Sequence, residues 1–180
     1  MAVKGKRNVK GARNEPAIKS KKRKIDKSKH ADLVEKGKKW LRGQKGKNWG
    51  CPIVFGELVT ATSETPDVMG LSSVNTTIIE CKTSRSDFLR DKKKMSRTLP
   101  QTGMGRFRLY MCPTDLIKVE ELPDGWGLIY VSEGGRSTLI EKPKGQSCNL
   151  RHEHTYMYSI IRRMCTGTNK EIKTFLRKYT

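Results

Sequence analysis

Three short segments rich in β-branched and aromatic residues follow one another in the first half of the chain. They are Pro52–Thr60, Asp67–Leu71 and Thr76–Cys81; a polar stretch ending at Pro66 separates the first two, and the turn Ser72–Asn75 separates the last two. Segments of this kind, bounded by turn residues, predict β-strands. We take the second and third strands to pair as a hairpin, which constrains how the rest of the chain can fold around them.

Helices are predicted on both sides of these strands. Before them, apolar residues recur at three-and-four spacing from Asp32 to about Gly43, which predicts a helix. After them, Ser84 is a favourable N-cap, and Asp87 three residues later completes an approximate capping box. The remaining predicted elements are a strand at Arg106–Cys112, a strand pair at Trp126–Val131 and Ser137–Glu141, and a basic helical tail from about His154 that is broken near Thr166.

The predicted order of elements is α-β-β-β-α-β, followed by a β pair and a C-terminal helix. This order mixes hairpins with a crossover, so we expect an α/β (α+β) domain with a mixed central sheet. We divide the chain into a disordered basic arm at residues 1–29, a core domain at 30–145 and a basic helical extension at 146–180.

The net charge of +20 points to a polyanionic partner. Residues 1–30 hold twelve Lys or Arg against two acids, and residues 31–180 hold twenty-six against sixteen, so half of the excess lies in the first sixth of the chain. A basic body with a basic arm is typical of proteins that bind a nucleic-acid backbone. Ribosomal proteins carry a similar charge without being enzymes. The charge therefore indicates DNA, or RNA, as the partner but does not indicate whether the protein is an enzyme.

The composition favours a cytoplasmic protein, and we expect a bacterial or phage-encoded one. No run of about 18 apolar residues is present, so we expect no membrane span. The five cysteines are odd in number and scattered, which suits reduced thiols better than a disulfide framework. The run Lys19–Lys24 resembles a nuclear import signal, which leaves a nuclear location open for a eukaryotic host.

The candidate catalytic motif is Glu80-Cys81-Lys82, at the end of the third strand. Residues two apart on a strand point to the same face, so Glu80 and Lys82 share one face and Cys81 points to the other. In a hairpin, Asp67 can lie beside Glu80 on that face. Two carboxylates together are the ligand type that Mg²⁺ prefers, and a lysine beside them can assist a water molecule or stabilise charge on a phosphate.

These residues resemble the PD-(D/E)XK nuclease superfamily, whose core has the same α-β-β-β-α-β order. More narrowly, residues 78–93 (IIECKTSRSDFLRDKK) and 106–113 (RFRLYMCP) resemble the bacterial MmcB-like family, to which DNA-repair nuclease activity is attributed. The resemblance covers roughly residues 50 to 131. It implies a restriction-endonuclease-like core and an Mg²⁺ or Mn²⁺ ion held by Asp67, Glu80 and the backbone carbonyl of Cys81, with Lys82 as the catalytic lysine.

A fourth catalytic group is less clearly marked. The superfamily often supplies a glutamate from the first helix, which would be Glu35. At about 100° per residue, however, Glu35 lies almost opposite the apolar face of its helix, which favours a solvated acid. Glu57, in the first strand, is the preferred alternative, because the MmcB-like pattern also tends to have an acid there. A structural partner for it would be Lys82 or Arg85.

The helix after the third strand is basic. Its N-terminus could hold a phosphate, and a forked arginine contact could add to it; a solvated charged face is the plainer interpretation. The candidate nucleic-acid-binding residues are Ser84, Arg85, Lys92, Lys93, Arg97 and Arg108. The cysteines and histidines at Cys148, His152 and His154 fit none of the usual zinc spacings, so we expect no zinc there.

Together these features predict a metal-dependent nuclease that hydrolyses DNA phosphodiester bonds in repair, recombination or phage DNA processing. No base-reading motif is evident, so we expect selectivity for DNA structure rather than sequence. A catalytically silent module of the same fold that binds DNA or RNA is the main alternative. A ribosome-associated structural protein, driven by the basic arm, is a third.

Overall fold

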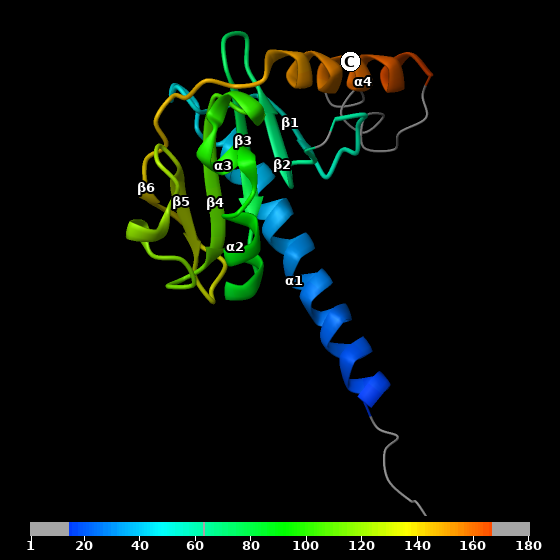
Figure 1. Ribbon diagram of the computed structural model, residues 1–180, viewed down its shortest axis with the longest axis vertical. Coiled ribbons are helices and arrows are strands. Elements are labelled where there is room, and N and C mark those ends of the chain that lie inside the picture. Colours follow the sequence, from blue (N-terminus) through cyan, green and yellow to red (C-terminus); the bar gives the residue numbers. More distant parts are fainter. Residues whose placement is uncertain (1–14, 63, 167–180) are drawn as a thin grey trace, which may run out of the picture.

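A six-stranded mixed sheet with helices on both faces forms the molecule (Figure 1). The computed structural model describes residues 15–62 and 64–166, with side chains from residue 27 onward. The α/β class predicted from the sequence is confirmed. The elements are α1 (Glu15–Arg42), β1 (Ile53–Gly56), β2 (Val68–Leu71), β3 (Thr76–Cys81), α2 (Arg85–Asp91), α3 (Met95–Thr98), β4 (Phe107–Pro113), β5 (Gly127–Val131), β6 (Ser137–Glu141) and α4 (Leu150–Thr166), with 3₁₀ turns at Pro100–Thr102 and Val119–Glu121.

The strands lie in the sheet in chain order, from β1 to β6. The first three are antiparallel, β3, β4 and β5 are parallel to one another, and β6 returns antiparallel to β5. The pairing of β2 with β3 as a hairpin is confirmed, with Val68 opposite Ile79. The crossover from β3 to β4 runs through α2 and then α3, so α2 starts directly after the end of the strand that carries Glu80.

Each face of the sheet has its own core. On one face, α1 packs Leu33, Val34 and Leu41 against Val68 and Ile79. The apolar stripe predicted for this helix is therefore its buried face. On the other face, α2 and α4 cover a second cluster that holds the largest buried aromatic side chains; its members include Phe88, Tyr110, Trp126 and Tyr156. The N-terminal part of α1 projects well beyond the sheet (Figure 1).

The first helix begins earlier than the sequence predicts. It starts at Glu15 rather than Asp32, so residues 15–29 are helical where a disordered arm was expected. Extending an existing helix costs one residue's freedom for each hydrogen bond gained, and Lys and Arg are good helix formers, so a basic segment can continue a helix anchored elsewhere. The first half of the predicted arm, residues 1–14, lies outside the described residues, as does the tail at 167–180.

Two other elements are shorter than predicted. The first strand ends at Gly56, because Glu57 has a positive φ of 46° that takes the backbone out of the sheet. The helix after β3 was predicted to place Phe88, Met95 and Leu99 on one face, but it ends at Asp91, and a short helix, α3, begins at Met95. The second change alters which side chains of this segment reach the surface. No helix in the described part of the chain is long and apolar enough to cross a bilayer.

Candidate functional site

The hairpin brings Asp67 next to Glu80. Val68 pairs with Ile79, so Asp67, one residue before β2, lies opposite Glu80, and directly opposite residues of an antiparallel pair share a face. The carboxylate oxygen Oδ2 of Asp67 accepts a hydrogen bond of 2.7 Å from the backbone N–H of Cys81. This bond fixes the aspartate at the end of β3, while the Cys81 thiol is buried on the opposite face.

Glu80 and Lys82 form a buried ion pair on that face. Lys82 Nζ donates to Glu80 Oε2 over 3.1 Å, and the two side chains are only 6% and 4% exposed. Burial is the largest influence on Glu80 and raises its pKa to about 6, although Lys82 and Arg97 act to lower it and Asp67 to raise it. Burial also acts to lower the pKa of Lys82, but the charges of the neighbouring carboxylates, Glu80 foremost, raise it overall.

Asp91 and Arg97 extend the pair into a buried network. Arg97 donates to Asp91 from Nε at 2.8 Å and lies 3.2 Å from Glu80 Oε1, while Lys82 Nζ lies 3.4 Å from Asp91. Tyr110 donates to Asp91 over 2.7 Å. Burial acts to raise the pKa of Asp91, but the hydrogen bond and charge of Arg97 hold that pKa well below its ordinary value. The network fixes both side chains of the Glu80–Lys82 pair.

His30, from α1, adds a group that the sequence did not single out. Its Nε2 lies 3.3 Å from Asp67 Oδ1, and its Nδ1 lies 3.5 Å from Glu57 Oε1. The hydrogen bond to Asp67 is the largest cause of a raised His30 pKa. A sequence signal existed: His30 lies three residues before Leu33 and four before Val34, which places it on the buried stripe of α1.

Glu57 lies at this site, and Glu35 does not. The backbone N–H of Glu57 donates to the carbonyl of Asp67 over 3.0 Å, which keeps the two residues side by side. The partner of the Glu57 side chain is His30 rather than the Lys82 or Arg85 considered from the sequence. The Glu35 side chain is 62% exposed and pairs with Lys38.

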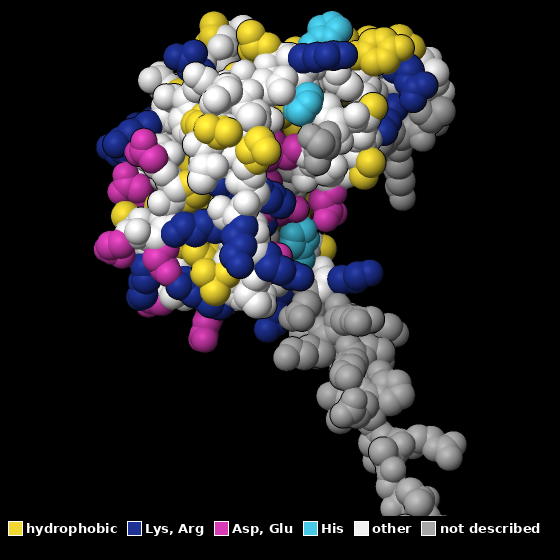
Figure 2. Space-filling view, in the orientation of Figure 1, with side chains coloured by type: hydrophobic (Ala, Val, Ile, Leu, Met, Phe, Trp, Pro, Cys, Tyr) yellow, Lys and Arg dark blue, Asp and Glu magenta, His cyan; other side chains and the backbone are white. Residues whose placement is uncertain are grey.

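Three ligand atoms, one each from His30, Glu57 and Asp67, lie within 4.8 Å of one another. In the described part of the chain this is the group that could hold a metal ion. In the space-filling view, a histidine lies among acidic and basic side chains where α1 leaves the sheet (Figure 2). The site therefore has two halves: an outer half formed by these three residues and an inner half formed by Glu80 and Lys82, with Asp67 between them.

Two of the arginines expected at a nucleic-acid surface are buried. Arg97 is enclosed by Asp91 and Glu64 and lies over the ring of Trp126. Arg108 is fully buried and donates to backbone carbonyls, among them those of Gly105 and Pro100. The prediction that these two contact DNA from the surface was wrong. Helix α2 ends early and so shifts the helical phase of Arg97, and Arg108 lies on a central strand covered on both faces.

The other expected nucleic-acid residues lie around the start and end of α2. Ser84 is its N-cap and accepts from the N–H of Asp87. Arg85 is half exposed and held by Glu121 through both terminal nitrogens. Lys92 and Lys93 are exposed, and basic side chains gather over this helix on the face seen in Figure 2. The exposed basic surface therefore lies beside the ion-paired end of β3.

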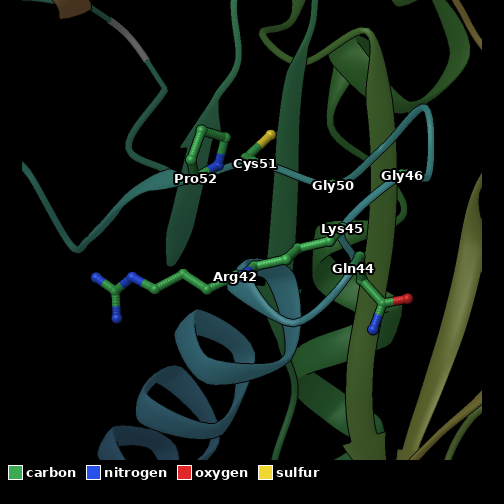
Figure 3. A pocket seen from close by; sticks show the side chains of 7 residues that line it. All are labelled: Arg42, Gln44, Lys45, Gly46, Gly50, Cys51 and Pro52. Carbon is green, nitrogen blue, oxygen red and sulfur yellow. The ribbon is translucent and has the colours of Figure 1, made fainter.

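A separate pocket of about 390 Å³ lies at the other end of α1 (Figure 3). Its lining includes Arg42 and Lys45 and the thiol-bearing Cys51. Arg42 is twelve residues along the helix from His30, which corresponds to about 18 Å at 1.5 Å per residue. The pocket is thus distinct from the carboxylate group and takes no part in it.

No protein-family model and no curated protein sequence match this chain. A solved structure of a protein of unknown function from Silicibacter pomeroyi is similar to it, with 21% sequence identity and a TM-score of 0.45 over 66% of this chain and 81% of that one. A likeness of this degree assigns no function, so the chemistry of the site rests on its own geometry.

Proposed function

We propose that this protein is a metal-dependent nuclease that hydrolyses DNA phosphodiester bonds and belongs to the PD-(D/E)XK superfamily, close to the MmcB-like family. The observation that carries the proposal is the buried Lys82, held against Glu80 and close enough to Asp67 for that carboxylate's charge to raise the lysine's pKa. A lysine is almost never fully buried unless it is paired, and the partner of Lys82 is a carboxylate of the candidate metal site. The element order from α1 to β4, which is the order that the resemblance to this superfamily implies, and the exposed lysines at the end of α2 support the same assignment.

The residues present fit a divalent cation at Asp67. Carboxylate oxygens converge there, and Oε1 of Glu80 is buried without accepting a hydrogen bond within the described residues, although Arg97 lies 3.2 Å away. Glu80 and the backbone carbonyl of Cys81 would then complete the inner side of the metal site. A bound Mg²⁺ or Mn²⁺ supplies Lewis-acid polarisation of the phosphate and a more acidic water molecule.

Each protein group has a distinct part in this reaction. Asp67, held in position by the Cys81 N–H, would bind the cation. Lys82 remains protonated at neutral pH, because its pKa is raised, and so stabilises the negative charge that develops on the scissile phosphate. Asp91 and Arg97 keep Lys82 and Glu80 in place. Lys92 and Lys93 attract the DNA backbone without reading bases.

A catalytically silent DNA- or RNA-binding module is a second candidate, and one observation favours it. Glu80 and Lys82 are closed off from solvent by their own ion pair and by Arg97. Neither group can reach a phosphate until that pair opens. A binding module would keep this arrangement for stability alone, with the basic surface as its functional part.

Cleavage of plasmid, single-stranded and branched DNA with Mg²⁺ or Mn²⁺ tests the proposal. We expect the wild-type chain to release products, EDTA to stop the reaction, and Lys82→Ala and Asp67→Asn each to lower the rate by about two to three orders of magnitude, as expected for loss of a charge-stabilising group. Thermal melting of each variant reports whether it is folded.

Lys142→Ala is the matched control, because Lys142 is exposed beyond the end of β6, away from the Glu80 end of β3. This variant should cleave as wild type does. If wild type and Lys82→Ala leave every substrate equally intact while both still bind DNA in EDTA, the binding module is correct and the nuclease proposal fails.

A further inference from the structure

The outer half of the site differs chemically from a set of carboxylates because it contains an imidazole. His30 comes from α1, Glu57 from the segment just after β1, and Asp67 from the residue just before β2. Three independent elements thus bring one nitrogen ligand and two oxygen ligands within 4.8 Å of one another. Mg²⁺ strongly favours an octahedral shell of oxygens and water, whereas imidazole nitrogen favours Zn²⁺, Fe²⁺, Co²⁺ and Ni²⁺.

We propose that His30, Glu57 and Asp67 form one metal site that takes a first-row transition-metal dication in preference to Mg²⁺. This inference rests on the proposed function, because both use Asp67 as a metal ligand. It adds the class of cation and the imidazole ligand. It makes His30 a direct metal ligand rather than only the ionic partner of two acids.

The distances suit such an ion with little rearrangement. Two ligands in a tetrahedral shell with bonds of about 2.1 Å are about 3.4 Å apart, and His30 Nε2 lies 3.3 Å from Asp67 Oδ1. Glu57 is the ligand that must move, because its oxygen faces the other ring nitrogen. Its side chain is 59% exposed, so it can turn without disturbing the core.

The two fixed ligands are held by the fold. His30 is on the buried stripe of α1, one turn before Leu33 and Val34, which are packed against the sheet. Asp67 is fixed through its second oxygen by the Cys81 N–H, which leaves Oδ1 directed at His30. Ligands that are held in place before the ion arrives lose little freedom on binding, which favours affinity.

Metal titration of the full-length protein without DNA tests the inference. Calorimetry with Mn²⁺ and with Mg²⁺ should show one Mn²⁺ site that is at least about tenfold tighter than any Mg²⁺ binding, because an imidazole nitrogen adds to the affinity for a transition metal but not to that for Mg²⁺, which keeps a shell of oxygens. Pulsed EPR of the Mn²⁺-bound protein should show ¹⁴N coupling from a directly bound imidazole. Co²⁺ should bind more tightly than Mn²⁺.

His30→Ala should abolish the ¹⁴N coupling and weaken Mn²⁺ by about tenfold or more while changing Mg²⁺ affinity by less than about twofold, because Mg²⁺ uses the oxygens alone. His154→Ala is the matched control, since His154 is exposed on α4, and it should alter neither metal. Circular dichroism checks that both variants are folded.

The inference is overturned if Mn²⁺ binds no better than Mg²⁺, if the ¹⁴N coupling is absent from wild type, or if His30→Ala weakens both metals equally; His30 would then be only an ionic partner of Asp67 and Glu57. The nuclease proposal fails separately. Selective Mn²⁺ binding with every DNA substrate uncut would support the metal site and contradict the nuclease proposal. DNA cleavage together with unchanged Mn²⁺ binding in His30→Ala would support the nuclease proposal and contradict the metal site.

Discussion

Buried charges at single residues stabilise the inner half of the candidate site. Asp91 accepts hydrogen bonds from Arg97 and Tyr110 and lies next to Lys82, with its side chain 2% exposed. A buried ion of this kind is tolerated because each charge has a partner, and removal of one partner leaves the others uncompensated. A substitution in the network therefore destabilises the protein because the charges that remain are buried without a partner.

Asp91→Asn should lower the free energy of unfolding at neutral pH by about 3–5 kcal/mol, because Arg97 and Lys82 lose a buried counter-charge. The folded-state pKa of Asp91 lies below its ordinary value, which is about 3.9. Its stabilising contribution is therefore complete above that pH and is lost as the pH falls through the lower folded-state value. Urea unfolding at a series of pH values should show the gap between wild type and variant closing below about pH 4.

Asp124→Asn is the control for this pH series, since Asp124 is exposed in a turn. It should leave the unfolding free energy unchanged within about 0.5 kcal/mol. A deficit in Asp91→Asn that is the same at every pH would contradict the assigned role of the carboxylate.

At the scale of elements, α2 begins where β3 ends, and one side chain fixes the transition. Ser84 has extended backbone angles and its hydroxyl accepts from the N–H of Asp87. Satisfying a free N–H in the first turn stabilises a helix as short as this one. The start of α2 in turn fixes where Asp87 and Asp91 stand relative to Lys82.

Ser84→Ala should destabilise the protein by about 1 kcal/mol, because the N–H of Asp87 loses its acceptor. Ser84→Gly should cost only a few tenths of a kcal/mol, since glycine is itself tolerated at an N-cap. Chemical denaturation gives both values. Ser73→Ala, in the exposed turn between β2 and β3, should have no measurable effect, and an equal loss there would rule out capping as the cause.

Gly70 allows the end of α1 to approach the sheet closely. A Cβ at this position of β2 would lie 2.5 Å from Leu41 Cδ2 and 2.7 Å from Cys51 Cβ. Gly70→Ala should therefore lower the melting temperature, at a cost of about 1–3 kcal/mol for overpacking. Gly134→Ala is the comparison, because the nearest atom to its Cβ would be 3.9 Å away; similar losses at both sites would exclude overpacking.

At the scale of the whole molecule, the buried charges that stabilise the fold are distinct from the exposed charges that give the protein its net charge. The sheet is covered on both faces, so the acids and bases of the network are inside, while the excess of cations is carried by the exposed side chains and by the N-terminal region. The net charge is +20. Charge of this size governs long-range attraction and its salt dependence rather than the fold.

If DNA is the partner, its binding should weaken steeply with salt, because each neutralised phosphate releases a counterion. Deleting residues 1–14 removes five cations and no acid. The slope of log K against log salt should then become shallower by up to about 4.5, that is, about 0.9 for each lost contact. Fluorescence anisotropy of a labelled duplex measures this slope. A Gly/Ser segment of equal length controls for chain length, and an unchanged slope would show that residues 1–14 do not contact DNA.

Much of the fold was predictable because it depends on neighbouring residues. The apolar stripe of α1, the β-branched strand β3 and the Ser84 cap each depend on contacts within one helical turn or one strand. Alternation along β3 also predicts that Glu80 and Lys82 share a face. The register that puts Asp67 opposite Glu80 required the hairpin assumption, and the pairing of Val68 with Ile79 confirmed it.

The tertiary structure alone decided the partners of the charged groups. The position at which α1 crosses the sheet brings His30 into contact with Asp67 and Glu57. The break between α2 and α3 turns the Arg97 side chain inward to Asp91. Periodicity reports which face of an element is apolar, but it carries no information on which distant element covers that face. The sequence by itself thus determined the strands, the caps and the acid-x-lysine face, whereas long-range packing decided which of its charges are buried and with what they pair.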